Sequence, residues 1–191
     1  MPPKAKITKE NILSAALDIV RQEGVDALNA RTLAGKLACS TQPIFSNYPN
    51  MKTLKSDVIA CANELYQQYL SNDMASGKYP PYKASGMAYI RFAREEKELF
   101  KLLFMRDRTE EEKSGTQELE PILAIIRNNY GLTREKAELF HIGMWVYVHG
   151  IATMIATSYL DWDTDLTSIM TSMAFNAMIK EFTSEEQNEC N

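Results

Sequence analysis

Four short polar side chains and one aromatic ring lie close together between residues 41 and 48. The group consists of Thr41, Gln42, Phe45, Ser46 and Asn47. On a helix with 3.6 residues per turn they fall on or beside the face opposite Ile44 and Tyr48, which we expect to point into a core. Exposed hydroxyl and amide groups match the donors and acceptors that base edges present in a major groove. The chemistry predicted for this segment is therefore hydrogen bonding to bases, with one aromatic contact.

Two short helices have to position these side chains, and residues 30–48 predict them. Leu33, Ala34 and Leu37 recur at helical spacing, and Asn29 precedes them as an N-cap. Ala38 falls at the turn that follows, where a small residue is wanted. The pattern favours a helix-turn-helix, although a helical hairpin with an ordinary solvated face has the same local signature.

The second helix has its own start signals. Ser40 is the expected cap, and Pro43 falls in the first turn, where a missing N–H costs little. We therefore expect the second helix to begin just after Ser40 and to end near Tyr48.

The segment from Ile12 to Leu54 resembles the N-terminal domain of the TetR family of transcriptional regulators. The matching residues are Ile12, Ala15, Ala16, Gly24, Leu33, Ala34, Ser40, Ile44, Phe45, Tyr48, Pro49 and Leu54. The match covers about a quarter of the chain and fixes positions in several helices. The resemblance implies a DNA-binding head and a C-terminal domain that holds an effector and dimerises.

The segment departs from the family pattern at four places. Ala38 stands where the family usually has Gly, Pro43 is unusual, Phe45 replaces Tyr, and Met51-Lys52 replaces Lys-Glu. Phe45 lacks a hydroxyl for a phosphate, and Lys52 or Lys55 would supply the charge missing at Met51. The predicted DNA-binding set is Thr41, Gln42, Phe45, Ser46, Asn47, Tyr48, Lys52 and Lys55.

The first 56 residues carry net positive charge and the rest of the chain net negative charge, a distribution that suits an N-terminal DNA-binding domain. The net charge is −4. Residues 1–56 contain eight Lys and Arg against four Asp and Glu, which gives +4, and the remaining thirteen against twenty-one give −8. Basic charge therefore accompanies the helix-turn-helix, where it would neutralise phosphates. The arm with Lys4 and Lys6 either contacts the DNA backbone or minor groove or is a solvated tail.

Composition places the 191-residue chain among cytoplasmic globular proteins. Hydrophobic residues make up 45%, and we expect neither a membrane span nor a signal peptide. Cys39, Cys61 and Cys190 are odd in number and far apart, so we interpret them as free thiols.

The rest of the chain predicts helices only. We expect them at about 8–23, 51–70, 81–96, 97–106, 117–130, 133–159 and 166–182, with a loop near 71–83 and a polar connection at 106–115. The fold class is all-α, with a three-helix DNA-binding domain over residues 1–50 and a helical bundle over 51–191. The helix from Met51 is the one long enough to connect the two.

The last two long helices have broad apolar faces. Small residues at Gly143, Gly150, Ala152 and Ala156 permit close helix approach. Paired with their copies, the two helices would form a four-helix bundle, the homodimer that the resemblance also implies. A buried hairpin in a monomer is the alternative.

Other local patterns do not amount to a catalytic or metal site. Asp161, Asp163 and Asp165 alternate like a calcium loop, but Leu166 stands where Gly is required, so helix capping explains them better. Glu138-x-x-His141 lacks the second copy that a di-iron site needs. We therefore predict no enzyme activity, no metal and no cofactor.

The C-terminal part carries enough aromatic and Met side chains to line an apolar pocket. Tyr66, Phe104, Trp145 and His149 are the candidate ligand residues, with His149 either a polar anchor or a hydrogen-bonded core residue. We expect a ligand-responsive repressor that binds a pseudo-palindromic operator as a homodimer. A helical small-molecule or protein-interaction protein with a degenerate DNA-binding head remains the alternative.

Overall fold

The computed structural model describes residues 7–107, 109 and 119–188, and every regular element in those residues is helical. The elements are α1 Lys9–Glu23, the 3₁₀ turn η1 Val25–Ala27, α2 Ala30–Lys36, α3 Gln42–Asn47, α4 Met51–Ala75, α5 Pro81–Glu95, α6 Lys97–Phe104, α7 Glu120–Tyr130, α8 Arg134–Ala156 and α9 Thr164–Asn188. The all-α prediction is confirmed. Lys4, Lys6, Cys190 and most of the connection at 106–115 lie outside the described residues.

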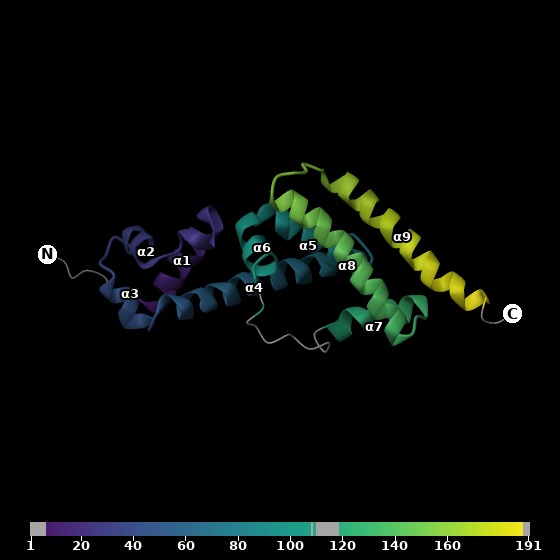
Figure 1. Cartoon of the computed structure of the whole chain (residues 1–191), viewed down its shortest axis with the longest axis horizontal. Coiled ribbons are helices and arrows are strands. Elements are labelled where there is room, and N and C mark those ends of the chain that lie inside the picture. The colour runs from purple at the N-terminus through teal and green to yellow at the C-terminus, as the bar shows by residue number, and fades with distance from the viewer. Residues whose placement is uncertain (1–6, 108, 110–118, 189–191) are drawn as a thin grey trace. The chain divides into compact units, whose positions relative to one another are not determined.

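The chain divides into two compact units. The N-terminal unit comprises residues 1–67 and 96–106, and the C-terminal unit comprises residues 68–95 and 107–191. In the N-terminal unit, α1 packs against α2, α3 and α6; Figure 1 shows α1, α2 and α3 gathered around the start of α4. Because α6 belongs to this unit, α1 packs on a helix that lies far beyond it in sequence.

The N-terminal unit has one apolar core. Its large, fully buried members are Ile12, Leu33, Ile44, Tyr48, Leu54, Leu99 and Phe100. At the same core's edge, Arg21 of α1 binds both carboxylate oxygens of Glu96, which is buried at the junction of α5 and α6. A buried carboxylate requires such a partner, so this ion pair fixes the start of α6 against α1.

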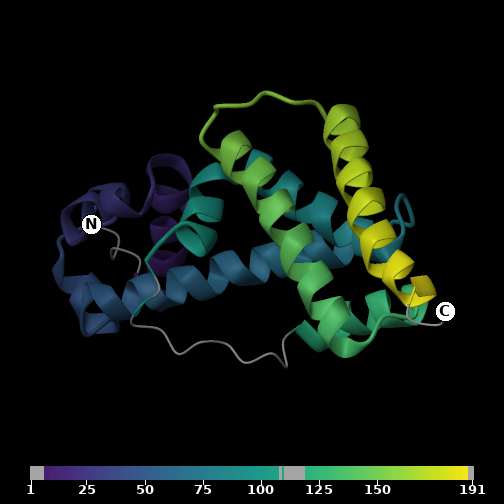
Figure 2. The same cartoon turned by 45° about the vertical axis from the view of Figure 1, so that its right-hand side comes forward.

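The C-terminal unit is built around α8. This helix packs against α5, α7 and α9, and Figures 1 and 2 both show α9 lying alongside it. A Cβ on Gly143 would come within 3.3 Å of the Met178 sulfur, so this glycine allows the close approach of α8 and α9. By length and composition α8 would also be able to cross a membrane, but 39% of its apolar window is buried inside the protein.

Several predicted helix ends need correction. The Ser40 cap is wrong, because Thr41 is the N-cap of α3, and its side chain accepts no hydrogen bond from the helix. Pro43 removes one of the N–H groups that a cap would bind. The predicted loop at 71–83 is too long, because α4 continues to Ala75. There the Asp73 carboxylate holds the Arg91 guanidinium of α5 at 2.7 Å, a long-range contact that stabilises the extra turn.

Other start and stop signals hold. Asn29 Oδ1 accepts hydrogen bonds from the N–H groups of Arg31 and Thr32 at 3.0 and 3.1 Å, and Thr133 caps α8. Gly24 and Gly131 end α1 and α7 with positive φ angles. Asp163 Oδ1 accepts from the Leu166 N–H at 2.7 Å, as expected of a helix-capping acid.

Ala38 carries strain in the turn between α2 and α3. Its φ is +48°, in the left-handed region where L-residues cost about 1–2 kcal/mol. Gly would relieve that strain but would lose about 0.5–1 kcal/mol to unfolded-state entropy.

We expect Ala38→Gly to raise the free energy of unfolding by about 0.5–1 kcal/mol, because the strain relieved exceeds the entropy lost. Ala60→Gly is the matched control: Ala60 is exposed inside α4, where Gly should lower stability by about 1 kcal/mol. Chemical denaturation of both variants measures the difference. Destabilisation by both would contradict the strained turn.

Candidate functional site

The two faces of α3 are as the sequence predicts. Ile44 and Tyr48 are buried, with exposures of 0% and 1%. The opposite side and its flanks expose Gln42, Phe45, Ser46 and Asn47. Pro43 stands within the first two helical positions, where its fixed φ suits the helix. The described geometry thus presents a short polar helix face with a half-exposed phenyl ring beside it.

Two of these polar groups are bonded to their own helix. Ser46 Oγ donates to the Gln42 carbonyl at 2.9 Å, and Asn47 Nδ2 donates to the Pro43 carbonyl at 2.8 Å. No hydrogen bond among the described residues engages the amide of Gln42. Gln42 therefore keeps all its side-chain donors and acceptors for a base edge, whereas Ser46 and Asn47 have each committed one donor inside the helix.

Tyr48 has a positioning role in this geometry. Its ring is buried, and its hydroxyl donates to Asp57 Oδ2 of α4 at 3.1 Å. Burial, with the Asp57 hydrogen bond, raises the pKa of Tyr48 to about 12. The hydroxyl is therefore a hydrogen-bond donor at any physiological pH, and it joins the end of α3 to α4.

Lys9 of α1 completes this cluster. Its Nζ lies 3.0 Å from Asp57 Oδ2 and 4.9 Å from the centre of the Tyr48 ring. The Lys9 ammonium, assisted by the Tyr48 hydroxyl, lowers the pKa of Asp57. Sequence analysis missed both Lys9 and Asp57, because no local pattern connects residues so far apart along the chain.

Two lysines lie in the first turns of α4, shortly after the end of α3. Lys52 is exposed and Lys55 half-buried, and no ion pair among the described residues engages either of them. Lys36 of α2, in contrast, lies 3.6 Å from Asp18. Asn50 caps α4 by accepting from the Thr53 N–H at 2.9 Å. The two α4 lysines are thus positive groups available to phosphates.

The four predicted ligand residues fall into two pairs, one in each unit. Tyr66 and Phe104 meet edge to face in the N-terminal unit, with ring centres 5.2 Å apart. Trp145 stacks on His149 in the C-terminal unit, with ring centres 5.1 Å apart and planes 16° apart. Each pair is a real contact, while the grouping of all four in one site stays a prediction.

His149 has protein partners on both ring nitrogens. The Tyr89 hydroxyl lies 2.8 Å from Nδ1, and the Thr153 hydroxyl lies 3.4 Å from Nε2. Burial lowers the pKa of His149, which favours the neutral ring at pH 7. These contacts are those of a hydrogen-bonded structural histidine, and a ligand would have to replace one of them.

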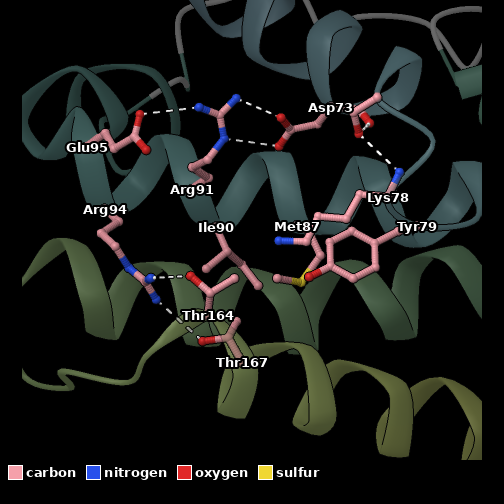
Figure 3. Close-up of a pocket in the computed structure, with 11 residues that line it drawn as sticks. Asp73, Lys78, Tyr79, Met87, Ile90, Arg91, Arg94, Glu95, Thr164 and Thr167 are labelled. Carbon is pink, nitrogen blue, oxygen red and sulfur yellow. Dashed lines mark hydrogen bonds and ion pairs between the residues drawn. The ribbon is translucent and has the colours of Figure 1, made fainter.

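The C-terminal unit contains a pocket that sequence analysis did not predict. It has a volume of about 160 Å³ and lies between the α4–α5 turn, one face of α5 and the beginning of α9. Figure 3 shows Arg91 turned toward Asp73 and Glu95, and Arg94 turned toward Thr164 and Thr167. Met87, Ile90 and Tyr79 form its apolar part. Charged and apolar side chains therefore converge here from three segments.

Comparison with known proteins gives a family profile match and a related protein. Residues 82–176 match the family profile described as "Tetracyclin repressor-like, C-terminal domain". The chain belongs to the TetR family. It is also 23% identical, over 181 residues, to the uncharacterized HTH-type transcriptional regulator Rv0681 of Mycobacterium tuberculosis, covering 88% of this chain and 79% of that protein. TetR-family proteins are helix-turn-helix transcriptional regulators and not enzymes.

The profile match lies outside α2 and α3, so the assignment of these two helices as the helix-turn-helix of the chain stays a prediction. Among the described residues, no group of three His, Cys, Asp or Glu side chains is placed to hold a metal ion. The departures from the TetR pattern are accommodated locally, since α3 forms with Pro43 in its first turn and the turn before it holds Ala38 at positive φ.

Gln42→Ala should weaken binding to a selected operator by about 1–3 kcal/mol, because a base contact is lost. Lys52→Ala should weaken binding to all duplexes alike and reduce the salt dependence by about one phosphate contact. Fluorescence anisotropy at several salt concentrations measures both effects. Gln67→Ala, also exposed but late in α4, is the control; equal binding by all three variants and the wild type would move the interface elsewhere.

Proposed function

We propose that this TetR-family regulator is a cytoplasmic homodimeric repressor that binds a pseudo-palindromic operator and releases it when a small molecule binds. The observation that carries the proposal is an exposed polar face on α3 in a chain that also exposes an apolar face on α8 and α9. The first suits a base-reading helix. The second suits a self-complementary contact that would place two such helices on one duplex.

The apolar face consists of large side chains at helical spacing. On α8 these are Leu139, Ile142, Trp145 and Val146, and on α9 Leu166, Ile169 and Met173, with exposures from 39% to 61%. So many large apolar side chains exposed on two neighbouring helices mark an interaction surface. Ala152 is not part of it, because its side chain is fully buried within the protomer.

Two-fold pairing of this face would produce a four-helix contact between copies. Two recognition helices can then bind successive major grooves about 34–36 Å apart, which makes the operator pseudo-palindromic. Occupying a promoter in this way blocks transcription without any further contact. Repression therefore requires only the surfaces that this chain presents.

The alternative is a helical interaction protein whose DNA-binding head is degenerate. The substitutions at Phe45 and Met51 favour it, because each removes a group able to contact a phosphate. Lys52 and Lys55 count against it, since both present positive charge beside α3. A gel mobility-shift experiment with DNA from the promoter region of the protein's own gene decides between the two functions, because only the first predicts specific binding.

Val146→Glu and Met173→Glu should each convert the dimer to monomer, because pairing would bury a carboxylate without a partner at a cost of several kcal/mol. Both side chains are more than half exposed in the protomer, so the fold should survive. Ala75→Glu, at an exposed position of α4, should leave the dimer intact. Sedimentation at micromolar concentration tests this; a monomeric wild type would refute the two-half-site proposal.

Effector control predicts a reciprocal effect on affinity. A compound that raises the melting temperature should bind the free protein and the operator complex with affinities that differ by roughly 5–150-fold, the usual range of allosteric coupling. Titration calorimetry with and without operator measures the ratio. Equal affinities would exclude that compound as the effector.

Variants locate the effector among the predicted residues. If it contacts the Trp145–His149 pair, Trp145→Ala and His149→Ala should each weaken its binding, and Tyr66→Ala would test the second pair. Because Trp145 also lies on the exposed apolar face, each variant should first be checked by sedimentation. Undiminished binding in dimeric variants would place the effector elsewhere.

A further inference from the structure

We propose that the pocket between the α4–α5 turn, α5 and the start of α9 binds a small organic carboxylate with a compact apolar body. The proposal goes beyond operator binding and does not depend on it. It concerns neither the predicted Trp145–His149 pair nor the exposed apolar face. It rests on three properties of the pocket: its net positive charge (three cations against two carboxylates), its apolar surface and its size.

The acidic side chains of the pocket are already engaged by one arginine. Arg91 binds Asp73 through Nε and Nη2 at 3.1 and 2.7 Å, and its Nη1 lies 3.4 Å from Glu95. Asp73 and Glu95 are the only carboxylates among the residues that line the pocket. Their charge is therefore directed at Arg91 and not at the other cations.

Arg94 is held by neutral oxygens. Its guanidinium donates to the Trp162 carbonyl at 2.6 Å and to the hydroxyls of Thr164 and Thr167 at 3.1 and 3.5 Å. These bonds fix its position at the start of α9 without cancelling its charge. A pre-positioned guanidinium of this kind loses little side-chain entropy when it binds an anion.

Lys78 is the second cation without a described carboxylate. Its ammonium lies 5.3 Å from the Tyr79 ring centre, and Figure 3 shows its side chain extending over the pocket toward Met87. Nearby, Lys83 lies 4.7 Å from the same ring and donates to the hydroxyls of Ser168 and Ser172. Positive charge thus gathers around Tyr79 in the acidic part of the chain.

The apolar surface of the pocket favours an organic anion over an inorganic one. The half-buried Tyr79 ring offers an apolar face to the pocket, and Met87 and Ile90, almost fully covered at 6% and 1% exposure, form the packed floor beneath it. Phosphate or sulfate would satisfy the cations but would leave this surface without an apolar contact. A carboxylate on a hydrocarbon or aromatic body satisfies both parts.

Size limits the body of the ligand. A volume of about 160 Å³ is close to the roughly 150 Å³ of an engineered cavity that holds benzene, and below the roughly 300–1,000 Å³ of sites for drug-sized molecules. The ligand class is therefore a carboxylic acid of about six to ten non-hydrogen atoms. Benzoate is a suitable probe of this class.

Isothermal titration of the full-length protein with benzoate, benzamide and inorganic phosphate tests the charge and the apolar surface separately. Benzoate should bind one site per chain with a Kd of about 0.1–1 mM. Benzamide has the same shape without the charge, and phosphate has charge without the apolar body, so each should bind at least about tenfold more weakly. No benzoate binding, or equal binding of benzoate and either comparison compound, would overturn the proposal.

Two variants test whether benzoate binds in this pocket. Lys78→Gln, at an exposed side chain, and Arg94→Gln should each weaken benzoate binding by about fivefold or more. Arg127→Gln removes the same charge from the exposed face of α7 and should change benzoate binding less than twofold. Because Arg94 also holds the start of α9, its variant is interpreted only if its melting temperature matches the wild type, and Lys78→Gln carries the test alone otherwise. Undiminished binding by Lys78→Gln would refute the site.

Discussion

A helix of six residues such as α3 cannot persist in water by itself, because so short a helix does not repay its nucleation. Burial of Ile44 and Tyr48 therefore holds α3 in place. Tyr48 contributes twice, since its ring fills the core and its hydroxyl binds Asp57, which Lys9 of α1 also holds. Three helices thus meet at one aromatic side chain, and the orientation of the exposed α3 face depends on that contact.

The N-terminal unit also includes α6, which follows much later in the sequence than α1–α3. α6 packs on α1, and the buried Glu96 carboxylate binds Arg21 at the point where α5 ends. An unpaired charge at that depth would be strongly unfavourable, so the pair selects one arrangement of α6 on α1. The start of α6 is therefore fixed to α1 within the N-terminal unit.

The C-terminal unit combines two kinds of surface with different uses. Its α8 and α9 expose large apolar side chains that pairing between copies would cover. The pocket at the start of α9 is instead bordered by Arg94, which is held on neutral oxygens, and by Lys78. Thr167 and Thr171 lie on the inward side of α9 and are buried, whereas Ile169 and Met173 are exposed. One helix thus contributes to both surfaces through different faces.

The sequence by itself determined the helical class, most helix boundaries, and the inward and outward faces of α3. These depend on periodicity and on caps such as Asn29 and Gly131, whose effects are local. Only the tertiary structure decided which partners the polar groups find: Tyr48 with Asp57, Arg21 with Glu96, and Asp73 with Arg91. It also revealed the pocket and separated buried Ala152 from exposed Val146 on one apolar helix. The reason is physical, because periodicity shows that a face is apolar, while distant segments of the chain decide what covers it.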